Sequence, residues 1–258
     1  MADSDSREDQ PGADPRVCVV SGAASGLGAA LVRRFASLGN RAVLADRNLP
    51  KAVDLADSIT ALGELAVARR VDVSDEESVR GLAEWLRAEH GRVDVLVNCA
   101  GIALAEGSVV EMTRKAWDLT IAVNLTGTFL MCRHLLPLMP AGGAIVNVST
   151  AGVRRTVPGT DAYVAAKGGV VSLTKAMAVS LADRGVRCNV VCPGVLATDE
   201  VRGRLNDARV QAMMARTAPL GRDWGDPDEF AAAVDFLCGP DASFINGAEI
   251  AVDGGATA

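Results

Sequence analysis

The sequence predicts a doubly wound α/β fold, in which helices cover both faces of a parallel sheet. Short apolar segments alternate with longer amphipathic segments along most of the chain. Aromatic residues make up only 3% of a chain that is 49% hydrophobic, so the core must be built from Ala, Val and Leu. Such a core suits helices packed closely on a parallel sheet. A chain of 258 residues has the length of one large domain or two small ones.

Composition also excludes several classes of function. The net charge is −6 and no basic block is present, which argues against nucleic acid as a partner. No apolar run has membrane-spanning length and the N-terminus carries no signal pattern, so we expect a soluble, cytoplasmic protein. The six cysteines are scattered and the only histidines are His90 and His134, so we expect reduced, buried thiols and no metal site.

Residues 1–15 are acidic and polar and predict a disordered tail, which leaves 16–258 as a single domain. The apolar strand Val17–Val20 leads into the glycine-rich turn 21–28, and a helix then continues to Leu38. Gly39 is expected to end this helix. A glycine turn between a strand and a helix lets a phosphate approach the backbone and the positive helix N-terminus. This pattern predicts a dinucleotide site.

Asp46 follows the second strand, 41–45, about 20 residues beyond the glycine turn. A carboxylate there can accept both ribose hydroxyls of adenosine and would repel a 2′-phosphate. Arg47 could instead bind that phosphate through its positive charge, while Ser25 in the turn adds no positive charge. The residues therefore favour NAD over NADP. A role for Asp46 in helix capping or in a turn is the alternative.

The next elements continue the alternation. Asp72 and Val73 follow the third strand, where a strand end can meet an adenine ring, and small residues follow the fourth strand, leaving room for a ligand. The pattern Ser74–Glu77 indicates a capping box at the start of a helix. The expected elements are a helix over 50–62, a strand over 66–71, a helix from the capping box to about 89, and a strand over 93–97 that ends in Asn98-Cys-Ala-Gly101.

A long helix is expected from about Thr113 to about Leu136, with Asn124 in its apolar middle. A buried asparagine must find hydrogen-bond partners. Either Asn124 is a satisfied core amide, or it distorts the helix locally and holds a water.

Tyr163, the only tyrosine, begins a helix that continues to about 183, and Lys167 lies one turn further on. An ammonium near a phenol favours the phenolate, so the tyrosine pKa falls toward neutrality and the group can exchange protons. Taken alone, the pair is better explained as a helix-anchoring tyrosine and a solvated lysine. The preceding strand, 144–148, ends in Ser149 and Thr150.

The last third contains a sixth strand, 187–192, which ends at Pro193-Gly194. The polar segment 195–225 predicts a mobile lid over the site. Asp226 begins a further helix through Leu237, and a seventh strand spans about 249–252.

Together these residues resemble the short-chain dehydrogenase/reductase family in its compact, Rossmann-like form, over about residues 16–258. Each motif alone is a weak signal, but their order and spacing match the family. The matching motifs are Gly22-x-x-x-Gly26-x-Gly28, Asp46, Asp72-Val73, Asn98-x-Ala-Gly101, Asn124, the hydroxyl pair 149–150, Tyr163-x-x-x-Lys167, Pro193-Gly194-x-x-x-Thr198, Pro219-Leu-Gly-Arg222 and Val252-Asp-Gly-Gly255.

The resemblance implies roles for the matching positions. Tyr163 would be the general acid/base, Lys167 would lower its pKa and bind the nicotinamide ribose, and Asn124 would anchor a water in a proton relay. A hydroxyl at Ser149 or Thr150 would hold the substrate oxygen. The implied cofactor-binding residues are Gly22, Ser25, Gly26, Leu27, Gly28, Asp46, Arg47, Asp72, Val73, Asn98, Ala100, Gly101, Tyr163, Lys167, Pro193, Gly194, Val195 and Thr198.

Three positions depart from the family pattern. Ser21 stands where threonine is more frequent, and Cys99 replaces the second asparagine of a frequent Asn-Asn-Ala-Gly. The family spacing from strand and tyrosine points to Thr150 as the catalytic hydroxyl, and the alternative is that Thr150 caps the strand while Ser149 supplies the contact. A threonine can make the same hydrogen bond, although its methyl group restricts the rotamer.

The leading hypothesis is an NAD-dependent oxidoreductase that interconverts a secondary alcohol and a ketone. An NADPH-dependent ketoreductase of 3-oxoacyl thioesters is the first alternative, and a non-catalytic cofactor-binding regulator is the second. The resemblance also implies a homotetramer or homodimer formed through the helices that contain Asn124 and Tyr163. The identity of the substrate is not readable from the sequence.

Overall fold

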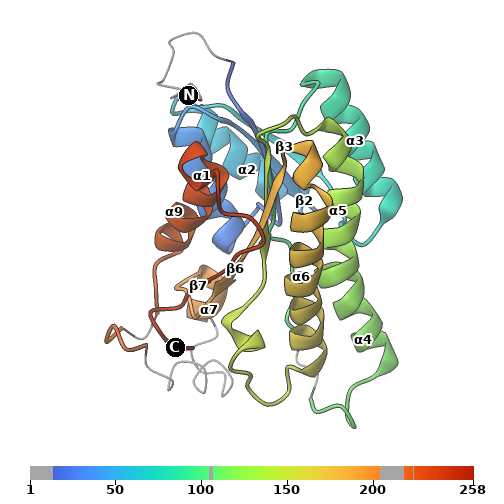
Figure 1. The fold of residues 1–258 in the computed structure, drawn as a ribbon, viewed down its shortest axis with the longest axis vertical. Helices are drawn as coiled ribbons and strands as arrows, with labels where there is room; N and C mark the ends of the chain where they lie inside the picture. Colours follow the sequence, from blue (N-terminus) through green and yellow to red (C-terminus); the bar gives the residue numbers. More distant parts are fainter. Residues whose placement is uncertain (1–13, 105–106, 204–217, 223) are drawn as a thin grey trace.

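The protein has seven parallel strands between two layers of helices (Figure 1). This computed structural model describes residues 14–104, 107–203, 218–222 and 224–258. Most of the predicted N-terminal tail and the middle of the predicted lid lie outside the described residues. The strands are β1 (Val17–Ser21), β2 (Arg41–Asp46), β3 (Ala66–Arg70), β4 (Val95–Asn98), β5 (Ala144–Val148), β6 (Arg187–Pro193) and β7 (Glu249–Val252).

The sheet order is β3-β2-β1-β4-β5-β6-β7, and every neighbouring pair is parallel. The chain first adds strands on one side of β1 and then returns to add β4 on its other side. In such sheets, ligands bind beyond the carboxyl ends of the strands where the order reverses. This position lies at the ends of β1 and β4, immediately before Gly22 and Cys99.

The central strands are apolar because helices cover them on both faces. Every residue of β1 and of β5 is buried. One core cluster lies between the sheet and the helices α1 (Gly26–Ser37), α2 (Leu49–Thr60) and α9 (Pro227–Cys238). Its largest fully buried side chains include Phe35 and Phe230. Gly39 follows α1 with φ of +77°, which confirms it as the residue that ends this helix.

The opposite face carries α3 (Glu76–Glu89), α4 (Arg114–Ile121), α5 (Gly127–Leu135) and α6 (Asp161–Ser180). Glycines bring these helices close to their neighbours. A Cβ on Gly127 would lie 2.8 Å from Val73 Cγ2, and one on Gly169 would lie 2.8 Å from Leu125 Cδ2. Close packing by small residues therefore compensates for the scarcity of aromatic side chains.

The predicted long helix is continuous but not uniform. A π-helical turn, η1 (Ala122–Thr126), separates α4 from α5, with Asn124 at its centre. The local distortion is therefore observed, while the water that Asn124 was expected to hold stays a prediction. By length and composition alone, the run Arg114–Leu138 would also qualify as a membrane span, contrary to our expectation that no apolar run has that length. In the fold it packs against α3, α6 and β4.

The predicted helix starts can be compared with the observed caps. Asp75, not Ser74, caps α3, and Ser74 instead donates its hydroxyl to Asp72 Oδ1. The predicted Ser74 capping box was therefore wrong, because the Ser74 hydroxyl donates its hydrogen bond to Asp72 and Asp75 caps the helix instead. Asp226 does form a complete capping box with Glu229 at the start of α9. Short elements complete the fold: η2 (Leu136–Leu138), η3 (Ala151–Val153), η4 (Ala182–Arg184), α7 (Asp199–Gly203) and η5 (Pro240–Ala242).

Candidate active site

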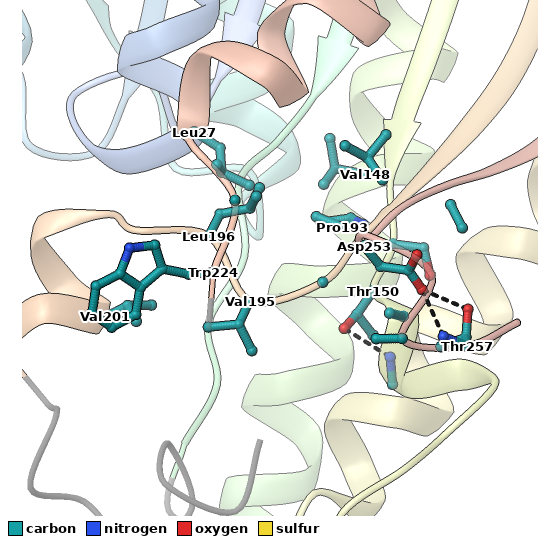
Figure 2. A pocket seen from close by; sticks show the side chains of 18 of the residues that line it. Leu27, Val148, Thr150, Pro193, Val195, Leu196, Val201, Trp224, Asp253 and Thr257 are labelled. Atoms are coloured by element: carbon teal, nitrogen blue, oxygen red, sulfur yellow. Dashed lines mark hydrogen bonds between the residues drawn. The ribbon is translucent and has the colours of Figure 1, made fainter. Parts of the chain in front are cut away.

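A cavity of about 870 Å³ opens at the carboxyl edge of the sheet. It extends from the glycine turn before α1 to the residues that follow β7. Figure 2 shows Leu27, Leu196 and Trp224 on one side of it, with Thr150 and Asp253 on the other. A cavity of this size at a topological switch point is where a dinucleotide and a small substrate would bind.

The glycine turn is shaped by close backbone approach. Gly22 has φ of +69°, and a Cβ on it would lie 2.7 Å from Ala100 Cα. Ser21 Oγ accepts hydrogen bonds from the N–H groups of Cys99 and Ala100, each at 3.2 Å. One serine hydroxyl therefore links the ends of β1 and β4. Ser21, at the position where threonine is more frequent, makes these hydrogen bonds with its own hydroxyl.

The N-terminus of α1 is left open by its own side chains. Ser25 is the N-cap residue but makes no side-chain capping bond, and the first turn of α1 contains no acidic residue. Side chains do cap four other helices, through Asn48, Asp75, Thr113 and Asp226. The backbone N–H groups of α1 therefore face the cavity without a side-chain acceptor from the N-cap, as a pyrophosphate site requires.

Asp46 lies at the end of β2 beside this turn. Its Oδ2 accepts a hydrogen bond from Ala24 N at 2.9 Å, and its Oδ1 accepts one from Asn48 N at 2.8 Å. Asp46 therefore fixes the glycine turn while it keeps a carboxylate at the strand end. Asp72 is held by Ser74, whose hydroxyl hydrogen bond lowers the pKa of that carboxyl group.

Six of the residues implied for cofactor binding do not line the main cavity. Asn98 points into the sheet interior, where its Nδ2 donates to Asn147 Oδ1 at 2.8 Å and to Cys132 Sγ at 3.2 Å. No pattern in the chain predicts this buried amide pair, because the partners lie on different strands. The six residues are Asp46, Arg47, Asp72, Val73, Asn98 and Ala100.

Tyr163 and Lys167 lie on the cavity side of α6. Lys167 is only 3% exposed, and its Nζ donates to the Val148 carbonyl at 2.8 Å. The same Nζ lies 5.9 Å from the centroid of the Tyr163 ring. Burial lowers the pKa of Lys167 to about 8, because desolvation disfavours the ammonium. A lysine placed beside a tyrosine at a cavity wall can stabilise the tyrosinate.

The two neighbouring hydroxyls have different surroundings. Ser149 is 1% exposed, and its Oγ donates to the Lys167 carbonyl at 2.9 Å. Thr150 is 9% exposed, and its Oγ1 accepts from Gly152 N at 3.1 Å, as Figure 2 shows. The Ser149 hydroxyl proton is therefore already engaged in a hydrogen bond within the protein. The Thr150 hydroxyl accepts the hydrogen bond from Gly152 N, so its own proton can be donated to a ligand oxygen.

Asn124 is fully buried and makes three hydrogen bonds. Its Oδ1 accepts from Ile102 N at 3.1 Å, and its Nδ2 donates to Ile102 O at 2.9 Å and to Thr120 O at 3.0 Å. The π-helical turn gives the side chain access to this segment after β4. Asn124 therefore holds the backbone of the segment after β4 and does not line the cavity. Its Oδ1 and the Lys167 Nζ both lie beside Gly101.

Beyond β6, the cavity is lined by Pro193, Gly194, Val195 and Thr198. Glycine is needed at 194, because a Cβ there would lie 2.8 Å from the Cβ of Asp253. Thr198 faces the glycine turn, since a Cβ on Gly26 would lie 3.4 Å from its Cγ2. The segment after β6 therefore forms the wall opposite the N-terminus of α1.

Several lining residues were missed by sequence reasoning. Asp253 accepts from Gly255 N and from both the N–H and the hydroxyl of Thr257, and so folds the residues after β7 into a turn against the cavity. The ending Val252-Asp-Gly-Gly255 matches the family pattern, but that pattern alone does not place it in the cavity wall. The other missed residues include Leu104 and Val157, whereas Leu220 and Trp224, which also line the cavity, belong to the segment 195–225 that was expected over the site.

Comparison with known proteins assigns this arrangement to a family. A family model described as enoyl-(acyl carrier protein) reductase matches residues 22–257. The cis-4-hydroxycyclohexanecarboxylate dehydrogenase of Sinomonas cyclohexanicum is 43% identical, over 94% of this chain and 97% of the relative. The D-threitol dehydrogenase of Mycolicibacterium smegmatis is 40% identical, over 95% and 94%.

Solved structures agree with this assignment. The 3-ketoacyl-(acyl-carrier-protein) reductase from Brucella melitensis, complexed with NADH, superposes with a TM-score of 0.83 at 33% identity, over 94% of this chain and 98% of that one. A short-chain dehydrogenase from Burkholderia cenocepacia, in complex with NADP, gives a TM-score of 0.87 at 31% identity, over the same shares.

The chain is therefore a nicotinamide-dependent oxidoreductase with a Rossmann-like fold. It belongs to the short-chain dehydrogenase/reductase family, which confirms the resemblance drawn from the motifs. Family membership implies a nicotinamide cofactor and a small-molecule substrate. It does not decide between NAD and NADP, because the two solved structures bind one each.

Proposed function

We propose that the protein is an NAD-dependent dehydrogenase that interconverts a secondary alcohol and a ketone, with Tyr163 as general acid/base. The observation that carries this proposal is the joint placement of Tyr163, Lys167 and Thr150 on one cavity that also reaches the uncapped N-terminus of α1. The curated relatives act on secondary alcohols by their names. The reaction class therefore agrees with the site.

The residues present fit a dinucleotide. The glycine turn and the N-terminus of α1 would hold the pyrophosphate, and Asp46 would hold the adenosine ribose. Pro193, Gly194, Val195 and Thr198 would line the nicotinamide side. When bound, the cofactor supplies the hydride chemistry, and the protein contributes binding, orientation and proton transfer.

The side chains divide the proton chemistry between them. Thr150 donates its hydroxyl hydrogen bond to the substrate oxygen, and Tyr163 takes the alcohol proton during oxidation or returns it during reduction. The Lys167 ammonium favours the tyrosinate by its charge. Ser149 holds α6 through the Lys167 carbonyl and so fixes the position of the lysine rather than the substrate.

The preference for NAD rests on Asp46. Its carboxylate is held at the strand end by two backbone N–H groups, so it cannot turn away from the ribose without losing both hydrogen bonds. A 2′-phosphate placed there would meet a fixed negative charge. Arg47 is exposed on the surface beside it and is the one feature that favours NADP.

The decisive experiment is a panel of secondary alcohols and ketones assayed with NAD(H) and NADP(H), followed at the nicotinamide absorbance. We expect turnover of alicyclic or short-chain secondary alcohols with NAD+. The substrate half of the cavity is lined mainly by apolar side chains such as Leu104, Val157 and Trp224, which suits an uncharged ring or chain. Turnover only with NADPH and 3-oxoacyl thioesters would instead establish the ketoreductase reading.

We also propose that the protein is a homotetramer or homodimer that works in the cytoplasm. The helices α4 and α5 present the large apolar side chains of Trp117, Leu119 and Phe129 at the surface. On α6, a Cβ at Gly168 would meet nothing within 4 Å, so a second helix could approach there. Light scattering coupled to size-exclusion chromatography tests the assembly, and a monomer at micromolar concentration would contradict it.

A further inference from the structure

Gly101, in the segment that follows β4, lies beside both Asn124 and Lys167. Its φ is not in the left-handed region, so its backbone conformation does not require glycine. The reason for glycine must therefore be space. A Cβ on Gly101 would lie 2.8 Å from Asn124 Oδ1, 3.3 Å from Lys167 Nζ and 3.7 Å from Lys167 Cε. Real Cβ atoms essentially never approach another heavy atom closer than 3.0 Å.

Neither neighbour can move away without loss. Asn124 is held by its bonds to both backbone groups of Ile102 and to Thr120 O. Lys167 is held through its bond to Val148 O. Both side chains are buried, and a buried polar group that loses its hydrogen bond keeps the full cost of desolvation. The missing side chain of Gly101 is thus what allows these two groups to occupy their positions together.

We propose that Gly101 is a positioning residue for the proton-transfer centre, because the absence of its side chain sets where the Lys167 ammonium lies relative to Tyr163. A methyl group at position 101 would clash with Asn124 Oδ1 and crowd the Lys167 ammonium, so the two groups could not both keep their positions. Gly101 would then act on catalysis through Lys167, in addition to any contact with the cofactor. The inference rests on the proposed roles of Tyr163 and Lys167.

The test is the substitution Gly101→Ala, read out on Tyr163, the sole tyrosine. Its tyrosinate absorbance can be titrated in the NAD+-bound protein independently of turnover. An ammonium within about 4–6 Å shifts a neighbouring pKa by roughly 1–3. Partial displacement of Lys167 is therefore expected to raise the tyrosine pKa by about 1, and to move the alkaline rise of kcat by the same amount.

The other titratable groups around Lys167 do not confuse this titration. Cys99 and Cys192 face the lysine, and burial raises the pKa of both thiols, to about 11 for Cys99. Cys99 therefore stays neutral over the pH range in which the tyrosine of the wild-type complex is expected to titrate, and the pKa of Cys192 is shifted in the same direction. Thiolate absorbance lies at shorter wavelength and is separated by recording a full spectrum.

The matched control is Gly81→Ala, the same change at an exposed glycine of α3 where a Cβ would meet nothing within 4 Å. It should leave the tyrosinate midpoint and the pH profile unchanged. Thermal unfolding and NADH binding, measured on both variants, separate a local effect from general damage. A Gly101→Ala protein that loses activity with an unchanged tyrosinate midpoint would overturn the inference.

A double-mutant cycle keeps the test decisive if Gly101→Ala folds poorly. Asn124→Ala removes the atom nearest to the new methyl group. Adding Gly101→Ala to Asn124→Ala should therefore cost less stability, and raise the tyrosine pKa less, than Gly101→Ala does in the wild type. If Gly101→Ala lowers stability and raises the tyrosine pKa equally in both backgrounds, steric crowding between position 101 and Asn124 is refuted. A wild-type tyrosinate midpoint near 10 would instead refute the proposed function itself.

Discussion

The two halves of the cavity are built by different means. In the nucleotide half, around β1, α1 and β2, the polar groups are the backbone N–H groups at the start of α1 and the Asp46 carboxylate, which lies beside the glycine turn outside the cavity lining. In the half around β5 and α6, they are side chains fixed by buried hydrogen bonds, such as Lys167 on Val148 O. Binding a pyrophosphate needs several donors of modest strength, whereas proton transfer needs single groups at defined positions. The halves should therefore respond differently to substitution.

The largest effect is expected in the catalytic half from Tyr163→Phe. This change removes the proton-transferring oxygen and leaves the ring in place. We expect kcat to fall by at least about 10²-fold, the lower bound of what general acid–base catalysis contributes. Steady-state kinetics measures this, and NADH binding should change little because the nucleotide half is untouched. A variant that keeps substantial activity would place the acid/base elsewhere.

Thr150 and Ser149 allow the sharpest comparison within the catalytic half. Thr150→Ala should lower kcat/KM by about 10- to 100-fold, the value of a hydrogen bond to developing charge, and Thr150→Ser should restore most of it. Ser149→Ala should leave kcat/KM nearly unchanged and lower the unfolding free energy by about 1 kcal/mol. The reverse pattern in the kinetics would assign the substrate contact to Ser149.

Asp46→Ser tests the nucleotide half. The affinity for NAD+ should fall by about tenfold, because charge-assisted hydrogen bonds to the ribose are lost, and NADP+ should be used better than by the wild type. The value of kcat at saturating cofactor should change little. Cofactor titrations and kinetics with both nucleotides measure this. A fall in kcat of the size expected for Tyr163→Phe would break the distinction between the halves.

Lys167→Met probes the buried ammonium through stability. The pKa of Lys167 is lowered to about 8 in the folded protein, from 10.5. Between these pH values the unfolded chain binds more protons, so the wild type gains stability as pH rises. Relative to Lys167→Met, the gain from pH 7.5 to pH 10 is at most about 3 kcal/mol. Urea denaturation at both pH values measures it, and a constant difference would contradict the desolvation.

The smallest effect is expected from Asp226→Ala at the N-terminus of α9. Here the helix is capped by its own side chains, in contrast to α1. Loss of this cap should lower the unfolding free energy by about 1 kcal/mol and leave kcat and cofactor affinity unchanged. The matched change Ser25→Ala at α1 should cost less stability, since no side-chain capping bond is lost. If Asp226→Ala and Ser25→Ala lower the unfolding free energy equally, the contrast between a capped α9 and an uncapped α1 is wrong.

The pattern of the chain was sufficient to predict much of the fold and many of the site residues. Apolar runs and glycine turns predicted all seven strands, because a strand buried on both faces must be continuously apolar. The capping of α3 was mispredicted, since Ser74 and Asp75 both satisfy the local rule and only their contacts decide between them. The assigned roles of Tyr163, Lys167 and Thr150 stay predictions that the experiments above test.

The family resemblance, the doubly wound fold and the spacing that puts Tyr163 and Lys167 on one helix face could be read from the chain alone, because these depend on local periodicity and on motif order. The hydrogen-bond partners of Ser149, Thr150 and Asn124, and the space around position 101, became visible only in the folded chain. Ser149 and Thr150 are neighbours with similar chemistry, and the carbonyl of Lys167 on another element engages one of them. Contacts between segments distant in the chain leave no periodic signal in either segment.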